Sequence, residues 1–386
     1  MEKRYLITLT AVTFLTAGLP SVVSAGDWLE FAVYGQTEHQ QAPDIYANTV
    51  VWQQLVEGDW DIYAADITDP LSPSVFVIAG FANDQQAPSV YENMVVWQHY
   101  IETDWDIWAA DITEAVNPHI FAVSGIIHND EQAPAIHGNI VVWQDGAAGD
   151  FDIFGADITE ANNPQEFFVA PYDFNQRAPA IYRSTVVWQD DYFGDWDLFA
   201  ADIWQRNKPS EFSVAVLEGH QQNPAIWSNI VVWEDDFFGT WDIYAADITN
   251  IHNPVEFLIC DHLFSQRNPD IDENIVVWQD DRNGNWDIYG CNLVTGYEFQ
   301  ITDDPADQTN PAVSGAVVVW QDNRGGYWNI YGMVLDGPEV ARPDWWTSRG
   351  VGTIDEDYNR LTVDWPLRLP TQVGAAGERS RPEYGF

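Results

Sequence analysis

A short hydrophobic run ending in tryptophan recurs along the chain and alternates with polar, turn-forming segments. The run is Val-Val-Trp in every case, with its tryptophan at Trp52, Trp97, Trp143, Trp188, Trp233, Trp278 and Trp320. The spacings between these positions are 45, 46, 45, 45, 45 and 42 residues. A fixed period of this length is typical of solenoids, propellers and repeat arrays. The pattern predicts seven copies of one structural unit in a single large domain.

One copy, residues 266 to 301, indicates what the unit is. Four short segments rich in β-branched and aromatic residues are separated by turn residues, which is the pattern of β-strands. They lie around Ile271 and at residues 275–279, 286–293 and 297–301, and we name them strands a, b, c and d. No stretch after residue 25 shows a helical period in its hydrophobic residues. Four antiparallel strands in each of seven copies predict an all-β fold, a seven-bladed β-propeller.

The ends of the repeat predict how the ring closes. The seventh copy has strands a to c, within residues 311–335, but no strand d follows it. Residues 28–34 precede the first copy. Their sequence Glu-Phe-Ala-Val resembles the strand d sequences that begin at residues 166 and 211. We expect this N-terminal segment to supply the outer strand of the last blade, which leaves no unpaired edge at the join. The recurring tryptophans are then expected in the core between blades.

The repeat resembles the TolB-like propeller repeats of secreted and cell-surface proteins. The shared text is Gln-x-x-Pro, then Asn-x-Val-Val-Trp-Gln-Asp, Gly-x-Trp-Asp-Ile-Tyr and a closing Asp-Ile, over residues 28–335. The resemblance implies chiefly a binding platform. TolB itself is expected to have six blades behind an α/β domain, so its role in the cell envelope is not carried over.

The first 25 residues read as a secretory signal peptide. A basic start is followed by an apolar run and by the small residues Val23-Ser24-Ala25, which is the pattern of a cleaved export signal. We therefore expect an extracytoplasmic protein, with the propeller at residues 26–335. Residues 336–386 depart from the repeat and are expected to form a partly disordered tail. No later stretch reaches the ~20 apolar residues of a membrane span.

The chain is strongly acidic, and this narrows the partners. The formal net charge is −45, from 15 basic and 60 acidic residues. Phosphate backbones require a basic surface, so nucleic acid is excluded as a partner. The acidity is compatible with cations, a basic partner or a saline habitat, and it keeps an exported protein soluble.

Candidate binding residues lie on the face that carries the b–c hairpins. Strands alternate in direction, so these hairpins and the d–a connections are expected on the same face of the disc. Several hairpin tips carry aromatic residues that a turn does not need, namely Tyr100, Tyr192, Phe193, Phe237 and Phe238. They could form an exposed patch for a protein or glycan, or they could fold back onto neighbouring blades.

A second candidate set follows the d–a connections toward one mouth of the central channel. It comprises Gln40, Gln85, Glu131, Gln176, Arg177, Gln221, Gln266, Arg267 and Gln308. Such a mouth is where propellers commonly hold ligands. The alternative is that the side-chain amides bond to the backbone between blades.

Metal and covalent chemistry find little support in the sequence. The turn with Asp281, Asn283, Asn285 and Asp287 looks like the start of a calcium loop, but the glycine and glutamate that an EF-hand requires are missing. No histidine pair has zinc-ligand spacing. Cys260 and Cys291 fall in different copies, and a small buried residue is the favoured interpretation of Cys291. We expect no cofactor.

These observations favour an exported, non-enzymatic propeller, most simply a monomer, that binds a protein or polysaccharide through its b–c face. The alternative is a carbohydrate-active enzyme, a polysaccharide lyase or glycosidase, with acidic residues at the channel mouth. A third is a purely structural module. An enzyme predicts two or three converging acids without counterparts in other blades, one with a strongly shifted pKa.

Overall fold

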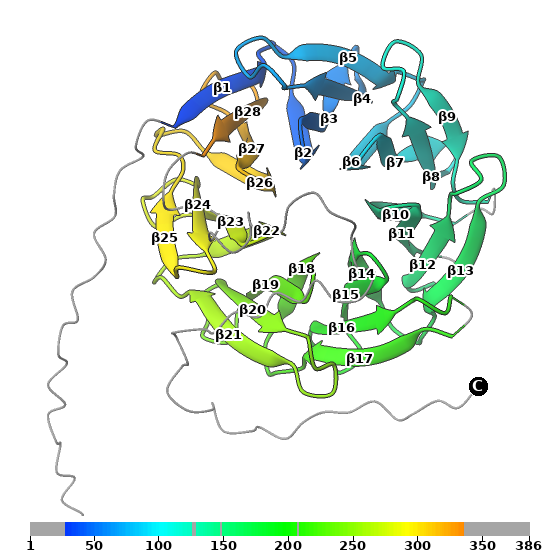
Figure 1. Cartoon of the computed structure of the whole chain (residues 1–386), viewed down its shortest axis with the longest axis vertical. Helices are drawn as coiled ribbons and strands as arrows, with labels where there is room; N and C mark the ends of the chain where they lie inside the picture. The colour runs from blue at the N-terminus through cyan, green and yellow to red at the C-terminus, as the bar shows by residue number, and fades with distance from the viewer. Residues whose placement is uncertain (1–27, 126–128, 147–148, 207, 336–386) are drawn as a thin grey trace, which may run out of the picture.

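The computed structural model describes residues 28–125, 129–146, 149–206 and 208–335. The expected signal peptide and tail lie outside these ranges. Across them the chain forms seven four-stranded antiparallel sheets and no helix. Figure 1 shows the sheets arranged around a central axis, with one strand of each lining the middle and one at the rim. The seven-bladed β-propeller is confirmed.

The first three blades follow the chain from strand a to strand d. Blade 1 consists of β2 (Gln40–Tyr46), β3 (Thr49–Val56), β4 (Asp59–Asp66) and β5 (Ser74–Ala79). Blade 2 consists of β6 (Gln85–Tyr91), β7 (Met94–Ile101), β8 (Asp104–Asp111) and β9 (His119–Ala122). Blade 3 consists of β10 (Glu131–His137), β11 (Ile140–Asp145), β12 (Asp152–Asp157) and β13 (Gln165–Ala170).

Blades 4 to 6 have the same strand order. Blade 4 consists of β14 (Gln176–Tyr182), β15 (Thr185–Asp190), β16 (Asp197–Asp202) and β17 (Ser210–Ala215). Blade 5 consists of β18 (Gln221–Trp227), β19 (Ile230–Asp235), β20 (Asp242–Asp247) and β21 (Val255–Cys260). Blade 6 consists of β22 (Gln266–Asp272), β23 (Ile275–Asp280), β24 (Asp287–Asn292) and β25 (Tyr297–Gln300).

Blade 7 joins the two ends of the described chain. It takes β26 (Gln308–Ser314), β27 (Val317–Asp322) and β28 (Asn329–Val334) from the last copy and β1 (Leu29–Tyr34) from the first residues. β1 pairs antiparallel with β28, and Phe31 lies opposite Gly332. Figure 1 shows β1 beside β28 at the rim of the ring. The predicted closure by the N-terminal strand is confirmed.

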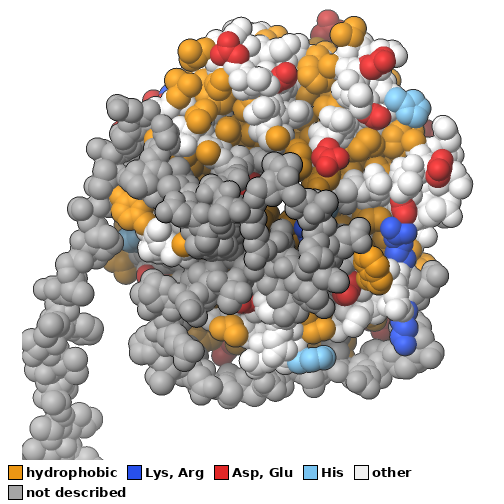
Figure 2. All heavy atoms as spheres, viewed as in Figure 1, with side chains coloured by type: hydrophobic (Ala, Val, Ile, Leu, Met, Phe, Trp, Pro, Cys, Tyr) orange, Lys and Arg blue, Asp and Glu red, His pale blue; other side chains and the backbone are white. Residues whose placement is uncertain are grey.

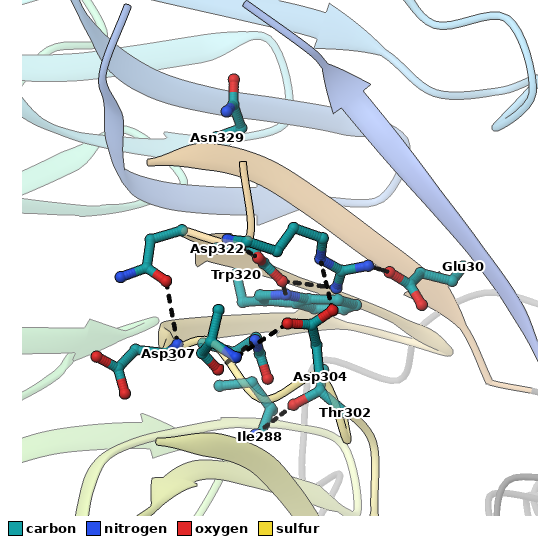
Figure 3. Close-up of polar contacts among 12 residues, drawn as sticks. Glu30, Ile288, Thr302, Asp304, Asp307, Trp320, Asp322 and Asn329 are labelled. Carbon is teal, nitrogen blue, oxygen red and sulfur yellow. Dashed lines mark hydrogen bonds and ion pairs between the residues drawn. The ribbon is translucent and has the colours of Figure 1, made fainter. Parts of the chain in front are cut away.

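An arginine in the b–c hairpin of blade 7 also holds this join. The Arg324 guanidinium contacts the carboxylate of Glu30 in β1 at 2.5 Å and that of Asp322 in β27 at 2.6 Å. Figure 3 shows Glu30, Asp322 and Asp304 around this one guanidinium. Asp322 is fully buried and also accepts the Trp320 indole N–H at 3.1 Å. The ion pair therefore ties the first strand to the last blade.

The core lies between the blades. All seven tryptophans of the repeat are buried, with exposed fractions of 0–1%. Each hydrophobic cluster combines residues of neighbouring blades: Trp188 of blade 4, for instance, lies with Ile153 and Val169 of blade 3. The interpretation of these tryptophans as core is confirmed.

A repeated hydrogen bond fixes the blade-to-blade geometry. The residue before the proline of each strand a has a positive φ of 49–52°, and a register shift in every a–b pair marks a β-bulge there. Its N–H donates to the Gln or Glu that follows the core tryptophan of the preceding blade, at 2.9–3.2 Å. The series includes Ala42 to Gln321, across the join. The Gln-x-x-Pro text is thus the sequence signal of an inter-blade contact.

Hydrogen bonds place the b–c hairpins and the d–a connections on one face, as predicted. The Tyr100 N–H donates to the Asp84 carbonyl at 2.8 Å, and the Asp236 N–H donates to the His220 carbonyl at 3.2 Å. Each bond joins a b–c hairpin to the connection that enters its blade. We call this side of the disc the hairpin face.

One close packing contact at the join gives a testable result. A Cβ at Gly332 would lie 2.6 Å from Cζ of Phe31, so Gly332→Ala is expected to displace the ring. Blades with alanine at this position still hold the opposing phenylalanine, as Ala64 and Phe76 do. The cost should therefore be ~1 kcal/mol, at the low end for overpacking. Urea unfolding of Gly332→Ala measures it.

Gly325→Ala is the matched control, because nothing lies within 4 Å of a Cβ at Gly325. Adding Phe31→Leu to Gly332→Ala should recover part of the loss. Equal urea midpoints for the two glycine variants would contradict this description of the contact.

Candidate functional site

The aromatic hairpin residues differ in their exposure. Phe237 and Phe238 of blade 5 are exposed, with fractions of 38% and 65%. Their rings meet edge to face with centroids 4.9 Å apart. Tyr100, Tyr192 and Phe193 are half-buried.

The half-buried residues fold back, as the alternative interpretation expected. Phe193 packs against the core cluster of blades 3 and 4. Tyr192 lies between Phe193 and Phe174, with ring centroids at 4.9 and 5.4 Å. Tyr100 packs on Trp105 of its own hairpin at 5.3 Å. Blade 5 alone among these hairpins presents its predicted aromatic pair to solvent.

Two exposed hydrophobic residues in the next connection of the same face were not predicted from the sequence. Leu263 and Phe264 are exposed at 90% and 51%, and they lie in the connection from blade 5 to blade 6. That connection bonds to both flanking hairpins: the Gln266 N–H donates to the Trp241 carbonyl at 2.7 Å, and the Asp281 N–H donates to the Ser265 carbonyl at 3.2 Å. Other d–a connections also carry large apolar residues, such as the exposed Phe81 and Phe174, so the sequence offered no distinct signal for Leu263 and Phe264.

We define the hairpin-face patch as Phe237, Phe238, Leu263 and Phe264. All four belong to adjacent segments of one face. A monomer rarely leaves several large apolar side chains together in water without a use for them. The patch is therefore a candidate for a macromolecular contact.

The glutamine set does not line an open mouth. Gln40, Gln85, Glu131, Gln176, Gln221, Gln266 and Gln308 are buried, with exposed fractions of 0–3%. Most bond to the backbone of the connection before them; the Gln266 amide, for example, donates to the Phe264 carbonyl at 2.8 Å. Gln40 accepts the Ile330 N–H of blade 7 at 3.0 Å. These side chains hold the connections in shape, which is the alternative that the sequence left open.

The two arginines of the set are also held by their surroundings. Arg267 forms an ion pair with the buried Glu234 at 2.7 Å and lies 4.5 Å over the Trp241 ring. Arg177 lies 4.4 Å over the Phe151 ring. Each therefore bridges its own strand a to the preceding blade.

Glu131 is the one carboxylic acid in the glutamine set, and its environment keeps the side chain neutral. Burial raises the pKa of Glu131 to about 9, the Ser124 hydroxyl lowers it, and the Asp145 carboxylate raises it. Ser124 donates to Glu131 and accepts the Ile107 N–H at 2.9 Å. A protonated glutamate can replace glutamine here because it too offers one donor and one acceptor.

The aspartates that begin strand c have raised pKa values in several blades. Burial is the first cause in each case, and it raises the pKa of Asp61 to about 6 and those of Asp152 and Asp242 to about 7. Neighbouring carboxylates add to the effect. Because the feature recurs from blade to blade, it belongs to the repeat and does not mark a single catalytic group.

The turn that looks like the start of a calcium loop forms several hydrogen bonds within the protein. The Asn283 amide donates to Asp287 at 2.7 Å and the Asn285 amide donates to the same carboxylate at 3.0 Å. The Asn285 amide also donates to the carbonyls of Asp304 and Ala306, both at 3.0 Å. Asp281 accepts the Ser265 N–H at 2.7 Å. The asparagines thus present N–H groups to Asp287.

A second feature missed in the sequence is an arc of aromatic rings at the end of strand a. The residues are Tyr46, Tyr91, His137, Tyr182 and Trp227, one each from blades 1 to 5. Neighbouring ring centroids are 4.3–5.7 Å apart and their planes differ by 38–59°. A seven-bladed ring turns by about 51° per blade, so the rings keep a similar orientation in each blade and pack on one another.

The arc does not continue into blades 6 and 7, where strand a ends in a small polar residue, Asp272 or Ser314. Asp272 accepts the Gly315 N–H at 2.6 Å, and the Ser314 hydroxyl accepts the Ala47 N–H at 2.9 Å. An open groove of about 500 Å³, lined by Tyr46, Asn48, Asp66, Thr68, Glu92 and Asn93, adjoins the blade 1 end. In blades 1 to 5 the residue six positions after the Gln or Glu that begins strand a is aromatic, so the sequence did contain a signal for the arc.

Figure 2 shows how side-chain types are distributed on one face of the ring. Acidic and hydrophobic side chains are interspersed over the blades, with only a few basic side chains among them. Among the described residues, no helix is long and apolar enough to cross a membrane.

Comparison with solved structures supports the fold. The chain is 11% identical to an oligogalacturonate lyase from Vibrio parahaemolyticus, covering 83% of this chain and 97% of the other, with a TM-score of 0.58. It is 12% identical to the β-propeller domain of the Trilobed protease from Pyrococcus furiosus, covering 80% and 97%, with a TM-score of 0.57.

A puromycin-hydrolyzing peptidase from Mycobacterium tuberculosis is also similar. It is 11% identical, covers 74% of this chain and has a TM-score of 0.56, and the chain spans about half of it, 49%. No protein-family model and no curated protein sequence matches the chain. The comparisons show the propeller fold, and the TolB-like resemblance remains a prediction.

Proposed function

We propose that this protein is an exported, extracytoplasmic, non-enzymatic propeller that holds a protein or polysaccharide on its hairpin face. The observation that carries the proposal is the hairpin-face patch, where Phe238 and Leu263 are exposed at 65% and 90%. Binding hot spots are rich in aromatic side chains that become desolvated in the complex. A monomer is the simplest assembly that leaves this face accessible.

The chemistry of the patch favours the protein half of this proposal. Phe237 and Phe238 meet at an interplanar angle of 85°, so the two rings cannot form one flat platform for a sugar. Leu263 adds an aliphatic side chain, which suits a hydrophobic side chain of a partner. The net charge of −45 favours a basic rim around the partner's contact, because opposite charges speed association.

The alternative, a carbohydrate-active enzyme, has a specific observation in its favour. The lyase from Vibrio parahaemolyticus shares the fold over 97% of its own length. Against it, the raised pKa values of Asp61, Asp152 and Asp242 recur by symmetry, and Glu131 is buried with 3% exposure. Binding without catalysis accounts for this distribution more simply.

The test is a comparison of Phe237→Ala/Phe238→Ala with wild type on a glycan array and against a displayed random-peptide library. The double variant should lose binders selected on wild type by at least ~10-fold, as expected for hot-spot residues. Its unfolding free energy should change by less than ~0.5 kcal/mol, because exposed residues contribute little to stability.

Trp204→Ala is the matched control. Trp204 is exposed at 82% and lies between strands β16 and β17, on the connection opposite the hairpin face. Binders should persist on this variant. Binders that remain on the double variant, or a wild type that selects neither glycan nor peptide, would rule the proposal out.

A further inference from the structure

A sulfur, an imidazole and a carboxylate from two blades converge beside the hairpin face. They are Cys260, the last residue of β21, His262, two residues later, and Glu298 of β25. One potential ligand atom from each lies within 4.8 Å of the others. The His262 Nε2 and the Glu298 Oε1 are 3.6 Å apart. The fold, and not local sequence spacing, assembles this set.

From this convergence we propose a Zn²⁺ site formed by Cys260, His262 and Glu298. Thiolate sulfur, imidazole nitrogen and carboxylate oxygen are the three ligand types that zinc takes in proteins. Harder ions such as Mg²⁺ and Ca²⁺ prefer all-oxygen sites, so the sulfur and nitrogen select a borderline metal. Three protein ligands leave a fourth tetrahedral position for water. This proposal is independent of the binding function proposed above.

Burial and the Glu298 carboxylate raise the pKa of the Cys260 thiol, whereas Arg282 and the His262 backbone N–H lower it. The Arg282 guanidinium donates to the Cys260 Sγ at 3.3 Å and to the Glu298 carboxylate at 2.6 Å. The His262 backbone N–H also bonds to the Cys260 sulfur. Hydrogen bonds of this kind orient metal ligands and stabilise their charged forms. Arg282 is itself fixed, 4.0 Å over the Tyr289 ring.

The local charge balance favours a divalent ion. Arg282 already contacts two carboxylates, Asp280 and Glu298. When Cys260 gives its proton to solvent, as metal binding requires, three negative groups face one guanidinium. The resulting net charge of two negatives is neutralised by one Zn²⁺.

Access is available from one side. Cys260 is buried, Glu298 is half-buried and His262 is exposed, with 49% of the His262 side chain open to solvent. The imidazole can therefore turn toward an arriving ion while the thiol and carboxylate stay in place. An ion held here would tie strand d of blade 5 to strand d of blade 6.

The experiment is a Co²⁺ titration of the reduced, chelator-treated full chain, followed by Zn²⁺. Wild type should develop a thiolate-to-cobalt charge-transfer band at one Co²⁺ per chain, and Zn²⁺ should remove it. Cys260→Ser should show no band. His262→Ala and Glu298→Gln should weaken Co²⁺ affinity at least ~10-fold, and His262→Ala should stay folded because the side chain is exposed.

Two controls keep the result specific. Cys291→Ser removes the other buried thiol, and His252→Ala removes an exposed imidazole elsewhere. Both should retain the band with unchanged affinity, and near-ultraviolet circular dichroism should verify folding of each variant. No band in folded wild type, a band that survives Cys260→Ser, or equal affinity in His262→Ala would overturn the proposal.

Discussion

A chain that starts at Gln36, and so lacks β1, is expected to lose at least ~5 kcal/mol of stability relative to one that starts at Trp28. β1 contributes two buried side chains, Phe31 at 6% exposure and Val33 at 2%. Loss of a buried phenylalanine alone costs about 3–5 kcal/mol, and loss of a buried valine adds about 2 kcal/mol. Since whole proteins are stable by only about 5–15 kcal/mol, the shortened chain should unfold or aggregate at moderate temperature.

The measurement is thermal unfolding of the two chains, followed by tryptophan fluorescence. A synthetic peptide of residues 28–36, added to the shortened chain, should restore much of the melting temperature. An added strand supplies the missing backbone bonds of β28 and fills the Phe31 site. Equal melting temperatures without the peptide would refute closure by β1.

The second large effect concerns pH, and it depends on Glu131. Its pKa is raised in the folded protein from 4.5 to about 9. Between these values the folded state holds one proton that the unfolded state lacks. Stability from this group is therefore complete below pH ~4.5 and is lost as pH rises to ~9, by up to about 1.4 kcal/mol per pH unit.

Glu131→Gln should remove this loss, because an amide makes similar hydrogen bonds at every pH. Relative to wild type, the variant should gain ~2–4 kcal/mol between pH 5 and pH 8. Urea unfolding at four pH values measures the difference, and Glu57→Gln, in an exposed turn, is the control. Parallel pH profiles for wild type and Glu131→Gln would contradict a neutral Glu131.

The sequence was sufficient for the fold because the fold repeats. Seven copies of Val-Val-Trp gave the blade number, and the strand d text at residues 28–34 gave the closure. The same alternation of strand-forming and turn-forming residues occurs in each copy, so an element that is ambiguous in one copy can be identified from the others. The exported state, the tail and the lack of a cofactor remain predictions.

The candidate sites were harder to predict, because exposure is a property of packing. Nothing in the amino-acid sequence distinguishes Phe193, which folds onto the core, from Phe238, which does not. Likewise, the glutamines lie at the start of the innermost strand of each blade, yet their side chains are buried and most form hydrogen bonds to the backbone of the preceding d–a connection. The Cys260, His262 and Glu298 set was invisible because its members meet only when blade 5 packs on blade 6.

Every site described above depends on a closed seven-bladed ring, and hydrogen exchange of β1 tests that closure most directly. The amides of Leu29–Tyr34 that face β28 should exchange about as slowly as those of β28, Asn329–Val334. Exchange this slow is expected if β1 completes blade 7 in the intact chain. Exchange of the β1 amides as fast as in a free peptide, while β28 stays protected, would contradict it.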